Sequence, residues 1–168
     1  MKTRQLINTA GIKVIKISET FRAETYDDAR PNHKLKTGEI PTGTLTIGWG
    51  HTGPEAYIGN RISPTEADEI LELDMGRAER TVSTSVENAL TSNQFSALVS
   101  LVYNIGSEAF RKSTLLKLLN DGNYIGASEQ FKRWVYDRGE KLPGLIIRRE
   151  REKLLFLKCE VEDGEQSV

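Results

Sequence analysis

The sequence is poor in cysteine and has no excess of charge of either sign. Cys159 is its only cysteine, so no disulfide can form within the chain and nothing requires an oxidising compartment. The flanking residues of Cys159 are mostly apolar, which favours a packing role for its side chain. Lysines and arginines number 23 against 24 acidic residues, for a formal net charge of −1. This balance gives no overall attraction to nucleic acid or to an anionic membrane.

A long uninterrupted hydrophobic run is also missing. The first twenty residues include basic side chains, but polar residues interrupt their apolar stretch too often for a signal-peptide core or a membrane anchor. We therefore expect synthesis in the cytoplasm and no stable membrane insertion. The 168 residues contain no repeat and no low-complexity linker, and this length suits a single domain.

Helix signals recur over most of the chain. Ser63, Pro64 and Glu66 combine an N-cap, a first-turn proline and a capping box, which predicts a helix from Ser63 to about Val82. Thr91 and Gln94 repeat the capping box before a stretch that is apolar on nearly every face and ends at Gly106. Such a helix is expected at the centre of the domain. The other helices are predicted at about 8–19, 113–120, 124–136 and 144–158.

The first of these helices carries an apolar stripe at spacings of three and four. The stripe consists of Ile7, Ala10, Val14, Ile17 and Phe21, and its N-cap is Asn8 or Thr3. Residues 23–53 then break the helical pattern with prolines, glycines and the alternating run "TLTIGWG", which is typical of short strands. The sequence therefore predicts an α+β fold. We expect one domain over residues 1–158, with a small sheet lobe at about 20–62, a helical lobe at about 63–158 joined by the N-terminal helix, and a polar tail over 159–168.

Four carboxylates crowd the stretch "ETFRAETYDD", which runs from Glu19 to Asp28. Acidic residues are common in this chain, so the spacing alone favours a solvated charged turn. Glu19, however, stands where the first helix ends, beside apolar positions, whereas Asp28 falls in a wetter strand-to-turn segment. Two carboxyl groups in contrasting environments are a candidate acid and base.

The motifs "SETFRAETYDD", "TLTIGWGHTG", "NQFSALVSLVYNIG", "AFRKSTLLKLLNDG" and "LPGLIIRRERE" together resemble the bacteriophage-type lysozymes, or endolysins, of glycoside hydrolase family 24. The resemblance covers nearly all of residues 8–157. It implies a lysozyme-like fold and assigns the catalytic residues as Glu19, Asp28 and Thr46. Glu24 and Asp27 fall outside the family motif and are expected to be solvated charges.

One departure from the family concerns the connection between Asp28 and Thr46. Seventeen residues, Ala29 to Leu45, stand where the family commonly has five. Their prolines and glycines suit an enlarged hairpin or flap. We refer to this segment as the insertion, and its role does not follow from the sequence.

The resemblance implies hydrolysis of the β-1,4 bond between N-acetylmuramic acid and N-acetylglucosamine in peptidoglycan, without a metal or cofactor. Glu19 would be the general acid, while Asp28 and Thr46 would orient the attacking water, with inversion as the expected outcome. The expected partner is the glycan strand of peptidoglycan. The protein would be a monomer that reaches the wall from the host cytoplasm after a holin opens the inner membrane.

The remaining candidate residues have structural as well as functional interpretations. His51 closes the run "TIGWGH", and we favour a structural role for it, paired with Asp74 on the apolar face of the next helix. We expect Gly48 and Gly50 to permit an unusual backbone around Trp49 beside the substrate, and Tyr103 and Trp134 to supply apolar walls for sugar rings. The resemblance favours a place for Asn104 in the substrate cleft. Gly48 could equally belong to an ordinary tight hairpin, Asn104 could cap its helix, and Trp134 could belong to the core. Arg148 and Arg149 are expected mainly on a solvated helix face.

Two other functions remain open at this point. A lytic transglycosylase would cleave the same bond without water and leave a 1,6-anhydro product, but Asp28 and Thr46 argue against it. A non-catalytic wall-binding or phage structural module would be expected to have a degraded motif, whereas all three positions are filled here.

Overall fold

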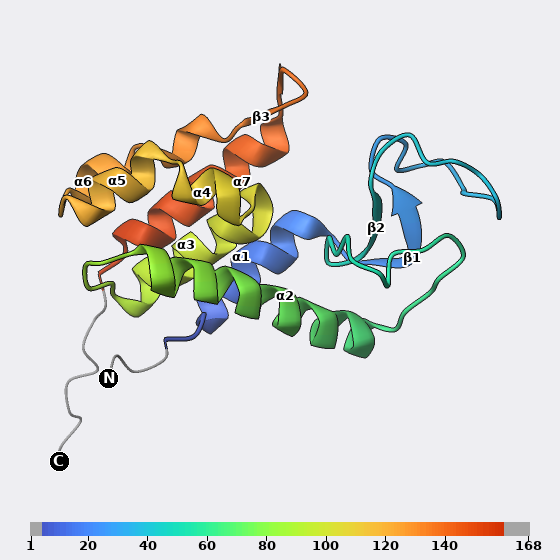
Figure 1. Cartoon of the computed structure of the whole chain (residues 1–168), viewed down its shortest axis with the longest axis horizontal. Helices are drawn as coiled ribbons and strands as arrows, with labels where there is room; N and C mark the ends of the chain where they lie inside the picture. Colours follow the sequence, from blue (N-terminus) through green and yellow to red (C-terminus); the bar gives the residue numbers. More distant parts are fainter. Residues whose placement is uncertain (1–4, 160–168) are drawn as a thin grey trace, which may run out of the picture. The chain divides into compact units, whose positions relative to one another are not determined.

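The computed structural model describes residues 5–159 and combines helices with two short antiparallel hairpins (Figure 1). This confirms the predicted α+β class. The chain divides into two compact units. The helical unit comprises the chain up to Val14 and from Arg77 onward, and the sheet unit comprises Ile15–Gly76. The sheet unit therefore contains the small lobe expected at about 20–62 and adds a helical segment at each end.

The helices are α1 (Thr9–Glu19), α2 (Pro64–Ser85), α3 (Ser92–Ile105), α4 (Ser107–Arg111), α5 (Thr114–Asn120), α6 (Tyr124–Ser128) and α7 (Pro143–Leu157), with a 3-10 turn η1 (Phe131–Arg133). The strands are β1 (Arg22–Asp27), β2 (Leu45–Gly48), β3 (Tyr136–Asp137) and β4 (Glu140–Lys141). Both predicted capping boxes are present. The Ser63 hydroxyl accepts from Glu66 N while Ser63 N donates to the Glu66 carboxylate, and Thr91 and Gln94 make the same exchange.

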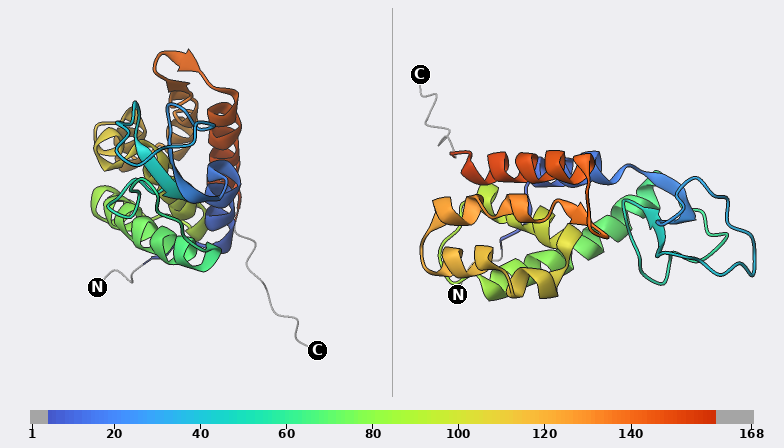
Figure 2. Two further views of the ribbon diagram at one scale, coloured as in Figure 1. Left: turned by 90° about the vertical axis from the view of Figure 1, so that its right-hand side faces the viewer. Right: turned by 90° about the horizontal axis from the view of Figure 1, so that it is seen from above.

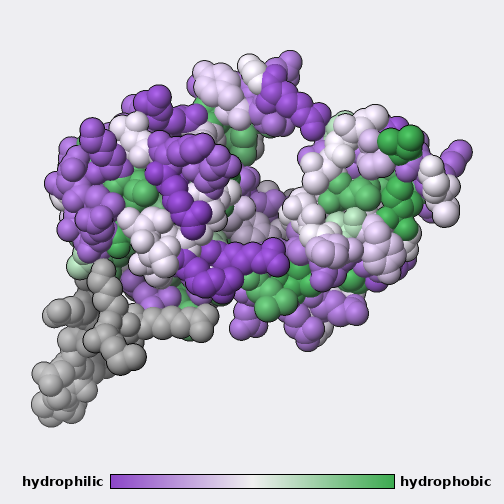
Figure 3. All heavy atoms as spheres, viewed as in Figure 1, coloured by the Kyte–Doolittle hydropathy of each residue, from purple (hydrophilic) through white to green (hydrophobic). Residues whose placement is uncertain are grey.

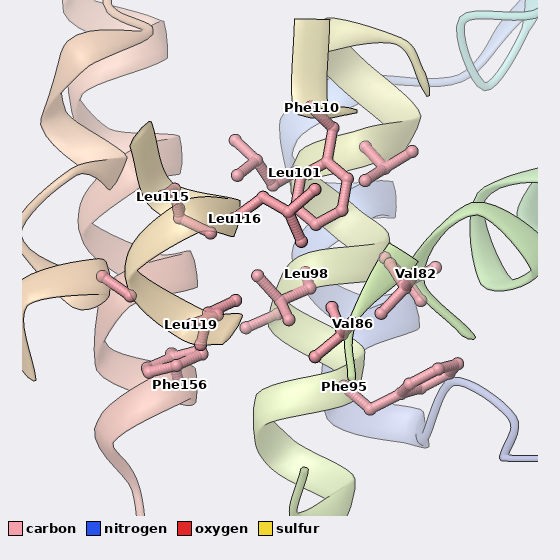
Figure 4. Packing of buried hydrophobic residues seen from close by; sticks show 14 of the residues in the cluster. Val82, Val86, Phe95, Leu98, Leu101, Phe110, Leu115, Leu116, Leu119 and Phe156 are labelled. Atoms are coloured by element: carbon pink, nitrogen blue, oxygen red, sulfur yellow. The ribbon is translucent and has the colours of Figure 1, made fainter. Parts of the chain in front are cut away.

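Helix α3 forms the centre of the helical unit, as its all-round apolar sequence predicts. Residues 95–102 of α3 are buried without interruption, and α7 runs beside this helix (Figure 2). Figure 4 shows how its side chains pack against α2, α4, α5 and α7. The labelled members of this core are Val82, Val86, Phe95, Leu98, Leu101, Phe110, Leu115, Leu116, Leu119 and Phe156. Hydrophilic residues cover much of the surface of this unit that Figure 3 displays.

The sheet unit has a smaller core of its own. β1 and β2 pair antiparallel, with Tyr26 opposite Thr46. Beneath them Ile47 packs with Ala56, Ile62 and Ala67, so that α2 covers the hairpin. The insertion joins the two strands as one long loop, in agreement with the enlarged hairpin that its prolines and glycines predict (Figure 1).

The segment 124–136 differs from its predicted helix. Helix α6 ends at Ser128, and after η1 the chain forms the β3–β4 hairpin. Arg138 and Gly139, the two residues between these strands, both have positive φ, at 48° and 85°. This is the backbone of a two-residue hairpin turn, so residues 136–141 form paired strands instead of the end of the predicted helix.

Burial differs from expectation at several positions of the helices. Ile17 was expected on the core stripe but is 49% exposed, because α1 buries Ile15 instead. Cys159 was expected to pack, but its side chain is exposed just beyond the end of α7. Arg148 and Arg149 were expected on a solvated face, but both are buried.

The two buried arginines surround a buried acid on the same helix. The Arg148 Nε lies 3.1 Å and the Arg149 Nε 2.8 Å from the carboxylate of Glu152, which is completely buried. Ser100 of α3 donates a further hydrogen bond to Glu152 at 2.8 Å. Each buried charge therefore has a partner, as burial requires. Arg148 and Glu152 are four residues apart, so they pair within one turn of α7, on a buried rather than a solvated face.

Candidate active site

Glu19 is the last residue of α1, at the point where the chain turns into the sheet. The following residue, Thr20, has a positive φ of 51°, a conformation that side chains other than glycine rarely adopt. The half-buried carboxyl of Glu19 lies directly against Gly50, where a Cβ atom would stand 2.6 Å from Oε2. The second glycine of "TIGWGH" therefore leaves room for the candidate acid.

Asp28 and Thr46 are linked through one intervening residue, Thr44. The Thr44 backbone N–H donates to Asp28 Oδ1 at 2.7 Å, and its carbonyl accepts from Asp28 N at 3.1 Å. The same carbonyl accepts from the hydroxyl of Thr46 at 3.2 Å. Asp28 is exposed, in accordance with its predicted wetter position, whereas Thr46 is buried. Despite the seventeen-residue insertion, the hairpin thus brings the two predicted residues to a common anchor.

Tyr26 belongs to the same cluster, although the sequence analysis did not select it. It pairs with Thr46 across the hairpin, and the guanidinium of Arg22 lies 5.2 Å from the centre of its ring. Burial raises the pKa of the Tyr26 phenol, and the negative charges of Glu19 and Asp28 raise it further, while Arg22 opposes them. The pKa of Tyr26 therefore depends on the charges of both candidate catalytic carboxylates. The available signal was that Tyr26 lies only two residues before Asp28 in the sequence.

Asp27 is not the solvated charge that the sequence suggested. It is completely buried, and its carboxylate accepts hydrogen bonds from the backbone of Ala29, Thr42 and Gly43, at 2.8 to 3.0 Å. The Thr42 hydroxyl and the guanidinium of Arg30 also donate to it. Burial would raise the pKa of Asp27, but the hydrogen bonds from Thr42, Ala29 and Arg30 outweigh it and hold the pKa far below its ordinary value. Asp27 anchors both ends of the insertion.

Glu24, the fourth acid of the stretch, is exposed as expected. Its carboxylate meets Arg61 at 3.0 Å on the surface of the sheet unit. The acids of this stretch thus have different partners: Glu24 meets Arg61, Asp27 accepts from both ends of the insertion, and Asp28 accepts from the backbone of Thr44.

His51 lies between two carboxylates. Its Nδ1 is 2.6 Å from Asp74, the partner that the sequence predicts, and its Nε2 is 2.8 Å from Glu55, which the sequence analysis missed. The ring is buried, and Gly53 leaves space for its Nε2 edge. Both ring nitrogens are thus occupied by acids of the sheet unit, which supports a structural role for His51.

Gly48 and Gly50 both have positive φ, at 65° and 87°, so the unusual backbone predicted around Trp49 is present. Gly48 is buried against Ile62 and Ala67 rather than open to solvent. The indole N–H of Trp49 donates to Asp68 at 2.7 Å, and the ammonium of Lys16 lies 5.1 Å from its ring centre. These contacts fix Trp49 against α1 and α2, while a contact of Gly48 or Trp49 with substrate stays a prediction.

The other predicted substrate contacts belong to the helical unit. Tyr103 and Trp134 are half-buried and pack against its core. Asn104 is exposed near the end of α3, and its side-chain oxygen accepts from the Arg149 guanidinium at 2.9 Å. That contact leaves the amide NH₂ group of Asn104 to meet an acceptor. Whether these three residues bind a glycan stays a prediction.

Within residues 5–159, no group of three or more His, Cys, Asp or Glu side chains is arranged to hold a metal ion. In the same part of the chain, no helix has the length and apolar character needed to cross a membrane.

Comparisons with known proteins agree on one family. The family model described as phage lysozyme matches residues 16–152. The endolysin of Acyrthosiphon pisum secondary endosymbiont phage 1 is 42% identical over 73% of this chain and 86% of its own length. The SAR-endolysin of Escherichia phage Mu is 41% identical over 68% of this chain and 66% of its own length. The chain spans about half, 54%, of the length of the Bacillus phage B103 endolysin, to which it is 37% identical over 90% of its residues.

A solved structure extends the similarity to three dimensions. The muramidase domain of SpmX from Asticaccaulis excentricus superimposes with a TM-score of 0.79 at 35% identity, covering 93% of this chain and all of that domain. The matched region includes Glu19, Asp28 and Thr46, together with both hydrogen bonds to Thr44. This chain therefore belongs to the phage lysozyme family.

Proposed function

We propose that the protein is an endolysin that hydrolyses the β-1,4 bond between N-acetylmuramic acid and N-acetylglucosamine in bacterial peptidoglycan. The observation that carries this proposal is that Asp28 and Thr46 both hydrogen-bond to the backbone of Thr44. The charges of Asp28 and Glu19 both raise the pKa of the neighbouring Tyr26. Glu19, Asp28 and Thr46 all belong to the sheet unit, which supports a shared role in hydrolysis.

Glu19 acts as the general acid and donates its proton to the departing glycosidic oxygen. Its place at the end of a helix, against Gly50, holds the carboxyl in a defined position. A positioned acid of this kind contributes a factor of about 10² to 10⁴ to the rate.

Asp28 and Thr46 position the water that attacks the sugar. The Thr44 backbone fixes one oxygen of Asp28. An ionised carboxylate has several lone pairs, so Asp28 can also accept a hydrogen bond and then a proton from water. The hydroxyl of Thr46 donates to the Thr44 carbonyl, so its lone pairs can accept from the same water. Attack by a water held in this way on the opposite face of the ring inverts the anomeric carbon.

The test is clearance of isolated sacculi by the wild-type protein and by single variants. We expect Glu19→Gln to lose at least about 100-fold, as removal of a general acid requires. Asp28→Asn should lose activity with its fold intact, and proton NMR of the fresh product should show the inverted anomer. Glu72→Gln, an exposed acid of α2, is the control and should behave as wild type. Near-wild-type clearing by Glu19→Gln would overturn the mechanism.

Mass spectrometry of the products separates hydrolysis from the transglycosylase alternative. Hydrolysis adds one water to each product pair, whereas a 1,6-anhydro ring does not. Failure of the purified wild-type protein to degrade sacculi would favour the non-catalytic module instead.

The route to the cell wall is a separate part of the proposal. From the sequence we expect release from the host cytoplasm through a holin. The name SAR-endolysin of the phage Mu relative points to secretion as the alternative. Expression in host cells with and without a co-expressed holin distinguishes them, because lysis without the holin would contradict the holin-dependent route.

A further inference from the structure

The insertion is a folded loop held by its own charged side chains. Asp27 fixes its first residues, Ala29 and Arg30, and its last turn, Thr42 and Gly43. Arg30 also reaches Glu39 at 3.1 Å, and Glu39 in turn accepts from His33 at 2.7 Å and from the backbone N–H of Lys36 at 3.0 Å. The loop therefore presents a defined surface.

One side of the insertion forms the wall of a hollow of about 730 Å³. The insertion contributes Pro31 to Leu35 to its lining, and the rest of the lining comes from β1, from Arg22 to Tyr26, and from the loop from Gly59 to Arg61. Pockets that bind small ligands span roughly 300–1,000 Å³, so the hollow is large enough to accept part of a substrate.

The charge of the hollow is predominantly positive. Four groups of its lining can carry positive charge, and one residue, Glu24, carries negative charge. Arg61 is neutralised by Glu24 at 3.0 Å and His33 faces Glu39. Arg22 and Lys34 remain, and neither has an ion-pair partner among residues 5–159. Both are exposed, so they are available to an anion from outside.

Apolar side chains stand between these cations. Pro31, Leu35 and the ring of Tyr26 line the same hollow, with the Arg22 guanidinium over the Tyr26 ring. A phosphate polymer has few apolar groups that could pack against these side chains. A short peptide carries methyl groups as well as carboxylates, so it fits both the apolar and the cationic parts of the lining. The hollow also adjoins the catalytic cluster, because Tyr26 belongs to both and pairs with Thr46.

We propose that Arg22 and Lys34 bind a carboxylate of the peptide that is attached to the glycan strand, and that the insertion forms the peptide-binding wall. This inference rests on the proposed function, because it assumes a peptidoglycan substrate. It gives the insertion a role in recognition of the peptide, next to the hydrolytic site.

The test compares cleavage of two substrates by the same variants. One substrate is intact sacculi treated with hydrofluoric acid to remove attached phosphate polymers, and the other is glycan strands freed of peptide by an amidase. The variants are Arg22→Gln, Lys34→Gln and the double variant, with Lys34→Glu as a charge reversal. Lys36→Gln is the matched control, since Lys36 is an exposed lysine of the insertion outside the hollow.

We expect the ratio of kcat/KM on peptide-bearing to peptide-free substrate to fall about threefold in each single glutamine variant and about tenfold in the double variant, chiefly through KM. Lys34→Glu should lower it further, and Lys36→Gln should leave it unchanged. An unchanged ratio in the double variant would contradict this inference, as would a fall that occurs only on sacculi that retain phosphate polymers. A wild-type protein that cleaves neither substrate would instead contradict the proposed function.

Discussion

The carboxyl of Glu19 lies so close to Gly50 that even a methyl group at position 50 would stand 2.6 Å from its Oε2. Gly50→Ala should therefore displace the candidate acid and reduce sacculus clearing, by up to about 100-fold if the carboxyl moves by about 1 Å. Gly38→Ala is the control, since Gly38 has a similar φ of 81° but no atom within 4 Å of the added methyl. Equal loss of activity in both variants would assign the effect to backbone strain instead.

Asp27→Asn should destabilise the protein although it leaves the three proposed catalytic residues in place. The amide cannot accept from as many donors as the carboxylate does, and the ends of the insertion lose their common anchor. We expect a Tm several degrees below wild type in a thermal melt and faster proteolysis within residues 29–44. Asp28→Asn, which changes an exposed side chain, should keep a nearly wild-type Tm. A larger loss of Tm in Asp28→Asn than in Asp27→Asn would contradict the assignment.

The same carboxylate predicts a pH dependence of stability. Its pKa in the folded protein lies below the ordinary 3.8, so the folded state favours the charged form. The stabilisation is complete above the ordinary pKa and declines as the pH falls toward the folded-state pKa. The Tm difference between wild type and Asp27→Asn should thus be constant from pH 7 to about pH 5 and shrink below about pH 3.8. A difference that grows on acidification would contradict this sign.

Tyr26 offers a direct test of the catalytic cluster. Because the charges of Glu19 and Asp28 raise the pKa of its phenol, Glu19→Gln and Asp28→Asn should each lower that pKa. The titration can be followed by NMR of the labelled Tyr26 ring or by ultraviolet absorbance at alkaline pH. Glu72→Gln should not change it. An unaltered titration in both active-site variants would show that Tyr26 lies apart from them.

Arg149→Ala should be among the most destabilising single substitutions in the helical unit. It leaves the buried Glu152 with one fewer compensating charge, and loss of one partner of a buried pair costs about 3–5 kcal/mol. Arg151→Ala, on the exposed side of the same helix, should change the free energy of unfolding by less than about 0.5 kcal/mol. Urea denaturation of both variants measures the difference, and comparable stabilities would contradict the buried network.

Most helix boundaries followed from the sequence because they are set locally. Capping boxes at Ser63 and Thr91 and the glycine at position 106 act within one turn of the backbone. Two segments are exceptions. Helix α4 was not predicted, and the segment after Ser128 leads into a hairpin whose turn, with positive φ at Arg138 and Gly139, is not revealed by helix propensity.

The burial of individual charged residues could not be predicted from the sequence either. Asp27 and Asp28 are neighbours of one residue type. Their separate environments depend on Thr42, Gly43 and Thr44, which lie near the far end of the insertion, about fifteen residues further along the chain. Arg149 likewise owes its burial to Asn104 and Glu152, neither of which a helix pattern marks as internal. The pairing of His51 with Asp74 was predictable because an acid on an apolar helix face needs a partner.

The closure of the insertion by a single carboxylate also bears on how the hairpin can be altered. Both ends of the insertion are bonded to Asp27. The pairing of the two strands therefore does not depend on the length of the chain between Pro31 and Pro41. Loops of other lengths and compositions could be exchanged at this position, provided that Thr42, Gly43 and Asp27 are retained. The hairpin is in this respect a natural grafting point, at which substrate range can be changed independently of the catalytic residues.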